Sequence, residues 1–191
     1  LDPQGQRPSS VLSQHLQEGE DSGALADINH LPLFPVTEQE DPASVLVQLT
    51  NQDSHRRALA EAFDEARGSL LILNPEIAET ALAADRIGEQ VARARRRGVA
   101  VTVVASRTAL TDGQRPAEEH PALARLAEAG AEVRLHPHLH TRAVARDDHC
   151  LLLGSYSWLA DPRAEPSPYQ RTARSARFSG RRAGELIAAL R

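Results

Sequence analysis

The sequence predicts an α/β fold in which helices cover both faces of a parallel or mixed β-sheet. Short apolar runs of strand length, such as Ser69–Leu73 and Val99–Val104, alternate with amphipathic segments of helical length. Continuous apolar runs suit strands that are buried on both faces. Gly68, Gly98 and Gly130 mark short joints between the elements. This alternation is typical of layered α-β-α domains.

Four segments carry the spacing of helices. The first, His55–Arg67, follows Ser54, which we expect to be its N-cap. Its apolar residues fall on one face, namely Leu59, Ala62, Phe63 and Ala66. Ala81–Arg97 and Pro121–Ala129 are the next predicted helices, and Arg182–Leu190 is a closing helix.

The second half of the chain adds further predicted strands. Ala131–Leu135 follows a glycine and is read as a strand. His140–Arg146 and Cys150–Leu153 are predicted to pair as a hairpin. Ala160–Gln170 contains three prolines and is predicted to be a loop. Thr172–Phe178 is expected to form an edge strand.

The composition separates the chain into two parts. Residues 1–44 are rich in Gln, Ser, Pro, Asp and Glu and have weak periodicity, so we predict an extended leader or linker with a short helix near Val11–Gln17. Within it, Leu31–Val36 is an apolar island that either packs on the folded domain or acts as a docking peptide. Residues 45–191 are predicted to form one domain, a size that can bury its own core.

Charge and cysteine content exclude several classes of protein. The net charge is −4, so the chain as a whole is not a polycation. The single cysteine, Cys150, rules out an intrachain disulfide and is read as an inert buried thiol. No apolar stretch approaches the roughly 18 residues of a membrane span, and no signal-peptide pattern opens the chain. We therefore expect a cytoplasmic protein without membrane contacts.

The most specific pattern is His-x-Arg, four residues, Asp, six residues, Gly-Ser-x-Ser. The residues that carry it are His140, Arg142, Asp147, Gly154, Ser155 and Ser157. The pattern resembles the HKD signature of the phospholipase D superfamily, His-x-Lys-(x)4-Asp-(x)6-Gly-Ser-x-Asn. Arg142 stands where that family has Lys, and Ser157 stands where it has Asn. All the basic residues of this chain are Arg, which suggests a coding bias.

The resemblance implies a phospholipase D-like half-domain over 45–191 and a role for each motif residue. His140 is the nucleophile or the acid of a phosphohistidine mechanism, and Arg142 holds the phosphate. Asp147 has a mainly supporting role, while Ser155 offers a hydroxyl and Ser157 occupies the Asn position. If His140 and Arg142 lie on a strand, they project from the same face. The chemistry implied needs neither metal nor cofactor.

One motif is half of such a site, so the resemblance implies a homodimer or a second half elsewhere in a larger protein. We favour a nuclease over a lipase, because nothing points to lipid and the arginine clusters fit a polyanion. The residues after the motif look like bacterial proteins in which this domain follows a helicase or ATPase module, some of them in phage defence. The alternative is a degenerate domain that serves dimerisation or nucleic-acid and partner binding.

Three histidines offer a rival interpretation of the same stretch. On a strand, His136, His138 and His140 would share a face and could bind zinc. However, Pro137 disturbs strand pairing, and no fourth ligand is evident. The other interpretation places His136 and His138 on the rim of the phosphate site.

Two arginine clusters and one tryptophan also have two interpretations each. Arg93, Arg95, Arg96 and Arg97 end a predicted helix. They either complement the helix dipole or contact nucleic-acid phosphates. A second basic cluster comprises Arg171, Arg174, Arg177, Arg181 and Arg182. Trp158 is read as a core residue, with base stacking as the alternative.

Overall fold

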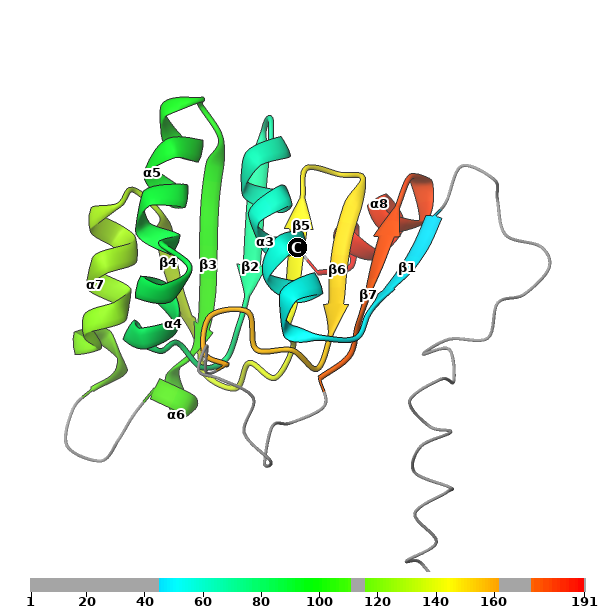
Figure 1. Ribbon diagram of the computed structural model, residues 1–191. Coiled ribbons are helices and arrows are strands. Elements are labelled where there is room, and N and C mark those ends of the chain that lie inside the picture. The colour runs from blue at the N-terminus through cyan, green and yellow to red at the C-terminus, as the bar shows by residue number, and fades with distance from the viewer. Residues whose placement is uncertain (1–44, 111–115, 162–172, 191) are drawn as a thin grey trace, which may run out of the picture. The chain divides into compact units, whose positions relative to one another are not determined.

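The computed structural model describes residues 45–110, 116–161 and 173–190. These residues form a seven-stranded sheet with the strand order β1-β7-β6-β5-β2-β3-β4 (Figure 1). β2, β3 and β4 are parallel, and every other neighbouring pair is antiparallel. The predicted mixed sheet is therefore confirmed. The leader predicted over 1–44, including Val11–Gln17 and Leu31–Val36, lies outside the described residues, as do Arg171 and most of Ala160–Gln170.

The strands are β1 Val45–Leu49, β2 Ser69–Leu73, β3 Ala100–Ser106, β4 Glu132–His136, β5 Ala143–Arg146, β6 Cys150–Gly154 and β7 Ser175–Ser179. The α-helices are α3 Gln52–Glu65, α4 Glu79–Ala84, α5 Ile87–Arg96, α6 Arg107–Leu110, α7 Pro121–Glu128 and α8 Arg181–Ala188. A short 3-10 helix, η1, spans Ala117–Glu119. The predicted helices at Pro121–Ala129 and Arg182–Leu190 correspond to α7 and α8.

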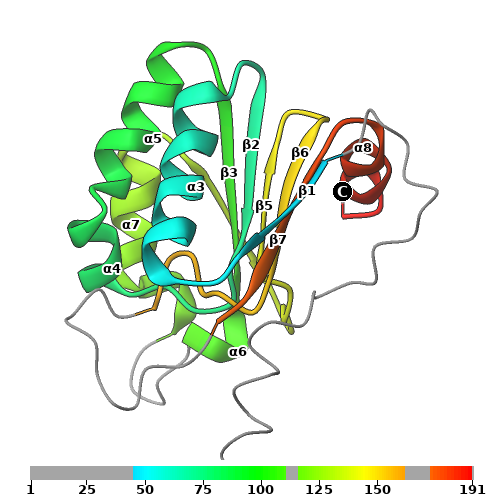
Figure 2. The same cartoon turned by 45° about the vertical axis from the view of Figure 1, so that its right-hand side comes forward.

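The helices cover both faces of the sheet. α3, α4, α5 and α7 lie on one face, and α8 lies on the other (Figure 2). Alternate residues of β2 serve the two layers. Leu70 and Ile72 belong to the large core beneath α3 and α5, while Leu73 belongs to the smaller core beneath α8. The layered α-β-α prediction is thus confirmed, because one strand supplies both cores.

Trp158 lies in the larger core and is fully buried. Its ring centroid lies 5.3 Å from that of Tyr156 and 5.5 Å from that of the buried His55. The nitrogen atoms of His55 lie 2.7 Å from the Asn51 carbonyl oxygen and 3.1 Å from Ser175 Oγ. The core interpretation of Trp158 is confirmed, since a buried ring cannot stack on a base.

Two predicted helix boundaries are wrong. The N-cap of α3 is Asn51, whose side chain accepts from Ser54 N at 2.8 Å, while Ser54 occupies N3 of the same capping box. The helix predicted over Ala81–Arg97 is two helices, α4 and α5. They are separated at Arg86, which adopts a left-handed conformation with φ 50°. Apolar spacing continues across this break, so periodicity alone did not reveal it.

Two predicted strands also need correction. Thr172–Phe178 is not an edge strand, because β7 lies between β6 and β1. The two edges of the sheet are β1, which was not predicted, and β4. The strand predicted over His140–Arg146 begins only at Ala143. Leaving β4, the chain passes the ends of β3 and β2 before it reaches β5 (Figure 1). Arg142 already bonds to the neighbouring strand, because its carbonyl oxygen accepts from Gly154 N of β6 at 3.3 Å.

Gly154 ends β6 against the backbone at the start of β7. A Cβ at Gly154 would lie 2.3 Å from the Arg174 carbonyl oxygen and 2.4 Å from Ser175 Cα. Glycine is therefore required here by space, because no side chain fits against this backbone. Further back on β6, Cys150 is 5% exposed, and burial raises the pKa of its thiol. The prediction of a buried thiol is confirmed.

Candidate functional site

The candidate site lies at the end of the sheet where β2 and β3 finish and β5 begins. Leu73 of β2 pairs with Ala143 of β5, so Asn74 and Arg142 follow and precede these partners at the same end. The connection from β4 to β5 passes this end and carries His138 and His140. Polar residues from segments far apart in sequence therefore meet at this end of the sheet.

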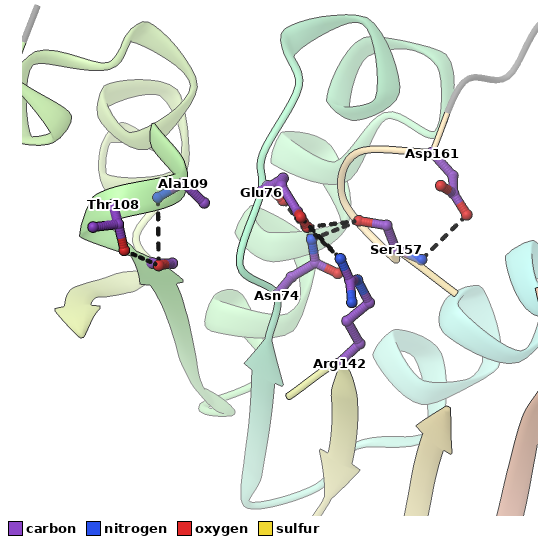
Figure 3. A network of polar contacts seen from close by, with 8 residues as sticks. Asn74, Glu76, Thr108, Ala109, Arg142, Ser157 and Asp161 are labelled. Carbon is purple, nitrogen blue, oxygen red and sulfur yellow. Dashed lines mark hydrogen bonds and ion pairs between the residues drawn. The ribbon is translucent and has the colours of Figure 1, made fainter. Parts of the chain in front are cut away.

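Arg142 forms an ion pair with Glu76, a residue from the segment after β2. Its Nη2 donates to Glu76 Oε1 at 2.8 Å and to Oε2 at 3.0 Å (Figure 3). The arginine side chain is 28% exposed and that of Glu76 is 44% exposed. Arg142 Nε is buried and has no hydrogen-bond partner among the described residues. The guanidinium is thus partly sheltered, and the acceptors it has are those of Glu76.

Asn74 and Ser157 complete the network. Asn74 is fully buried, and its Nδ2 donates to Ser157 Oγ at 3.0 Å and to the Glu76 carbonyl oxygen. Ser157 Oγ in turn lies 3.5 Å from Glu76 Oε2, and Ser157 N donates to Asp161 Oδ2 at 3.2 Å (Figure 3). Ser157 is 7% exposed. The serine at the Asn position of the motif is therefore held through both its hydroxyl group and its backbone amide.

His140 lies two residues before Arg142 and is exposed. No hydrogen bond holds its ring to the described part of the chain. Because this segment is not a strand, the predicted alternation that would put His140 and Arg142 on one face does not apply. Ser155 is also exposed, but its Oγ is engaged with the backbone of Arg174, accepting from N at 3.0 Å and donating to O at 3.2 Å. Ser155 therefore ties β6 to the start of β7.

Asp147 lies at the other end of β5. Arg142 precedes this four-residue strand and Asp147 follows it, which separates their Cα atoms by roughly 16 Å. The Asp147 carboxylate accepts from Gly68 N and Ser69 N, each at 2.8 Å, and from Arg67 N at 3.2 Å. The carboxylate thus joins the hairpin after β5 to the start of β2, a supporting arrangement remote from Arg142.

These amides also decide the acidity of Asp147. Burial by itself raises the pKa of the carboxyl, but the N–H groups of Ser69, Gly68 and Arg67 together outweigh it. The pKa of Asp147 is therefore lowered below its ordinary value of 3.8. The residue also adopts φ 51°, a left-handed conformation that aspartate tolerates better than most side chains.

The three histidines do not share a strand face. His136 is the last residue of β4, and Pro137 and His138 form a turn. β4 is three strand positions from β5, which places His136 roughly 14 Å from the start of β5. Among the described residues, no group of three or more His, Cys, Asp or Glu side chains could hold a metal ion. The strand geometry on which the zinc alternative depended is absent.

The arginine clusters do not adjoin Arg142. Arg93, Arg95, Arg96 and Arg97 lie at the carboxyl end of α5, beside the start of β3. β3 is seven residues long, so roughly 20 Å separates them from the candidate site. Arg93 pairs with Asp64, and Arg95 donates to the Val99 carbonyl oxygen at 3.2 Å. These contacts match the helix-terminus interpretation, and nucleic-acid binding by this cluster stays a prediction.

The second cluster is also dispersed. Arg174 lies at the site end of β7, whereas Arg177 pairs with Glu61 at 2.9 Å beneath α3. Arg181 and Arg182 begin α8 at the opposite end of the sheet. Closeness in sequence did not translate into one basic surface among the described residues.

Sequence reasoning missed Asn74 and Glu76, which the structure brings against Arg142 and Ser157. Both residues follow the predicted strand Ser69–Leu73 and lie outside the predicted motif. A signal was present, because a buried strand ends there in polar residues, and ligands of parallel sheets bind at the carboxyl ends of strands. The partners lie 66 and 83 residues apart, so no local pattern could pair them.

A match to a protein family decides the relationship. The family model described as "Cardiolipin synthase, PLD-like domain" matches residues 59–161, more than half of the chain. The chain belongs to this phospholipase D-like family. At the level of the family, this supports phosphodiesterase chemistry of the phospholipase D type. The matched range spans β2 to β6 together with the residues of the predicted motif. Among curated proteins, no sequence matches the chain.

Solved structures agree with the fold of this phospholipase D-like domain. Nuc from Salmonella typhimurium, a phospholipase D family member, superimposes with a TM-score of 0.57 at 18% identity, covering 76% of this chain and 91% of Nuc. NucT from Helicobacter pylori gives 0.51 at 12% identity, covering 77% and 92%. Polyphosphate kinase from Porphyromonas gingivalis gives 0.55 at 13% identity, covering 78% of this chain and 25% of the kinase. In the described part of the chain, no helix is long and apolar enough to cross a membrane.

Proposed function

We propose that this phospholipase D-like domain binds phosphodiesters of nucleic acid at Arg142 and cleaves them through His140, as a nuclease completed by a second half. The observation that supports it best is the site at the end of β2 and β5. There a partly exposed guanidinium and a serine hydroxyl lie within one hydrogen-bonded network, two residues from an exposed imidazole. Guanidinium is suited to phosphate because its donors match two oxygen atoms.

In the proposed reaction a ring nitrogen of His140 attacks phosphorus. A P–N bond forms, the P–O bond to the leaving group breaks, and the leaving oxygen takes a proton from a histidine of the opposing half. Water then attacks phosphorus and gives its proton to the opposing histidine, which lost its own in the first step; a new P–O bond forms and the P–N bond breaks. Arg142 and Ser157 would stabilise the charge that develops on the phosphoryl oxygens. The scheme uses no metal and no cofactor.

The opposing half is a second copy of this chain or a second motif elsewhere in the protein. The exposure of His140 supports this arrangement, because a histidine that acts across an interface must be reachable from outside its own subunit. A place in bacterial DNA processing or defence against phage stays a prediction.

The test is a cleavage assay with single-stranded and double-stranded oligonucleotides in the presence of EDTA. We expect cleavage that persists in EDTA and is lost in His140→Ala, with an acid-labile phosphoprotein intermediate in the native chain. His136→Ala is the matched control, because it removes an exposed histidine at the same end of the sheet. Cleavage that is lost in EDTA and restored by zinc would overturn the proposal.

A second function is favoured by one observation. Arg142 replaces the lysine of the motif and is already paired with Glu76. Tight binding of a ground-state phosphate does not by itself accelerate its cleavage. A domain that has lost turnover and retained phosphate binding would serve dimerisation or nucleic-acid docking. In that case the oligonucleotide binds through Arg142, and His140→Ala changes neither binding nor product formation.

A further inference from the structure

We propose that Glu76 is a built-in competitor for the phosphate site, an internal anion that a phosphodiester must displace from Arg142. The inference rests on the proposed function, because it presumes that Arg142 is the phosphate-binding group. It adds a regulating residue that belongs to no part of the predicted motif.

One carboxylate contacts both side chains that the motif assigns to the phosphoryl oxygens. Its Oε1 and Oε2 accept from Arg142 Nη2 at 2.8 and 3.0 Å, and Oε2 lies 3.5 Å from Ser157 Oγ. A phosphodiester likewise presents two charged oxygens to its binding groups. Glu76 therefore occupies the place in which the proposed substrate would make the same contacts (Figure 3).

The surroundings of Arg142 favour displacement over binding beside Glu76. The arginine is 28% exposed, and its Nε is buried, so a substrate can reach only the outer part of the guanidinium. A phosphate bound there while Glu76 stayed in place would hold two anions next to each other in a partly sheltered site. Such like charges repel each other more strongly than they do in bulk water.

Glu76 is placed so that it can leave. Its side chain is 44% exposed, so the released carboxylate can be hydrated. Its backbone is held independently of the carboxylate, because the carbonyl oxygen accepts from Asn74 Nδ2 and Asn74 is fully buried. The side chain can therefore swing away from Arg142 while the segment after β2 remains fixed.

The competitor also implies a preference among ligands. A small isolated phosphate gains at Arg142 little more than the contacts that Glu76 gives up. A polymer with further phosphates makes additional contacts elsewhere and can meet the cost of displacement. We therefore expect inorganic phosphate to bind the native chain weakly and an oligonucleotide to bind it better.

The test compares Glu76→Gln with Glu79→Gln in the full chain. Both substitutions remove one negative charge and keep the side-chain volume. Glu79 is a matched control because it lies three residues away, is 37% exposed and pairs with another arginine, Arg125, at 3.0 Å. The probes are inorganic phosphate, followed by calorimetry, and a short fluorescein-labelled oligonucleotide, followed by anisotropy.

We expect Glu76→Gln to tighten phosphate binding roughly three- to fivefold, the upper part of the range for one partly exposed ion pair. Glu79→Gln should change it by less than about twofold. The gain should disappear when the double variant Arg142→Ala/Glu76→Gln is compared with Arg142→Ala. The guanidinium for which phosphate and Glu76 compete is absent from both. The thermal midpoint of each variant is measured alongside, to confirm that it is folded.

The outcomes separate this inference from the proposed function. If Glu76→Gln binds no tighter than the native chain while Arg142→Ala binds more weakly, Glu76 is not a competitor and phosphate binding by Arg142 stands. If Arg142→Ala binds both probes as well as the native chain does, the proposed function itself is wrong. An equal gain in Glu76→Gln and Glu79→Gln would reduce the effect to net charge and overturn the inference.

Discussion

The two ends of β5 hold charged motif residues in different ways. At the hairpin end, the Asp147 carboxylate accepts from three backbone amides of Arg67, Gly68 and Ser69. At the other end, the acceptors of the Arg142 guanidinium are the side-chain oxygens of the partly exposed Glu76. Four strand residues separate an anion fixed by the main chain from a cation paired with an exchangeable partner.

The same short motif therefore contributes to the fold at one end of β5 and to the candidate site at the other. A backbone amide cannot move away unless the chain is rearranged, so a carboxylate bound by amides stabilises architecture. A side-chain carboxylate can rotate into water, so a guanidinium paired with it stays available to a ligand. We therefore expect changes at the hairpin end to affect stability, and changes at the Arg142 end to affect phosphate chemistry.

The largest expected effect on stability is an exception to this assignment. Gly154 lies at the Arg142 end of the sheet, and yet its replacement should affect stability rather than phosphate chemistry. Gly154→Ala places a methyl group against the backbone of Arg174 and Ser175, so β6 and β7 must separate. We expect the free energy of unfolding to fall by about 3 kcal/mol or more. Urea denaturation measures it. Gly88→Ala in α5 is the control, since its methyl would meet Ala129 Cβ at 3.9 Å and should stabilise by up to about 1 kcal/mol.

Asp147→Ala is expected to have the next largest effect on stability. It removes three charge-assisted hydrogen bonds and puts alanine at a positive φ. We expect a loss of about 2 kcal/mol, less than the sum of three such bonds because two of the amides become hydrated at the surface. Oligonucleotide affinity, measured on the folded variant, should stay unchanged. A weakened affinity at unchanged stability would reverse the assignment of the two ends.

The lowered pKa of Asp147 predicts a smaller effect that depends on pH. Since the folded-state pKa lies below the unfolded value near 3.8, the stabilisation is fully present above that value and is lost as the pH falls through the folded-state pKa. The difference in unfolding free energy between the native chain and Asp147→Asn should therefore be constant near neutral pH and shrink on acidification. A difference that grows below pH about 4 would contradict the assignment.

The smallest expected change in stability is that of Arg142→Lys. The Arg142–Glu76 pair is partly exposed, so we expect less than about 0.5 kcal/mol. Turnover should rise, because a compact ammonium replaces a planar guanidinium at the phosphoryl group, provided that the opposing half supplies its histidine. Single-turnover cleavage measures it. If the native chain cleaves rapidly and Arg142→Lys slows it, Arg142 is an adapted catalytic group.

Ser157→Asn restores the other motif residue, and the structure qualifies what to expect from it. Ser157 is 7% exposed, and its Oγ accepts a hydrogen bond from Asn74 Nδ2. The longer side chain of asparagine would therefore collide with the buried amide of Asn74. We expect a cost of about 1–3 kcal/mol in stability. Any gain in turnover should add to that of Arg142→Lys. Turnover of the double variant must therefore be measured below its unfolding temperature.

Much of the fold was readable because its strands are continuous apolar runs bounded by turn residues. Ser69–Leu73 was predicted with its exact bounds, and β3 and β6 within two residues. β1 was missed because its continuous apolar run, Val45–Val47, is only three residues long and lies between polar segments. The break at Arg86 was missed because a left-handed residue leaves no trace in apolar spacing.

The candidate site was readable only in part. Two residues of the motif, Arg142 and Ser157, contact the same Glu76 carboxylate, whereas Asp147 lies at the other end of β5. The motif gave no hint of Asn74 and Glu76, whose contacts arise when β2 and β5 pair. The strand assumed for His140 was wrong for the same reason, since local alternation says nothing about whether a neighbouring strand exists.

The pairing of β1 with β7 also has a consequence for how the chain reaches its native state. Val45 pairs with Ser179 and Leu49 with Ser175. β1, the first described strand, can therefore join the sheet only after β7, the last, has been synthesised. During synthesis, β1 has no partner until nearly the whole domain has left the ribosome. Such distant pairing makes folding slow, because a long loop must close first. The Arg142 site is assembled from β2, β5 and the residues after β6. Its parts can therefore come together before β1 joins the edge of the sheet.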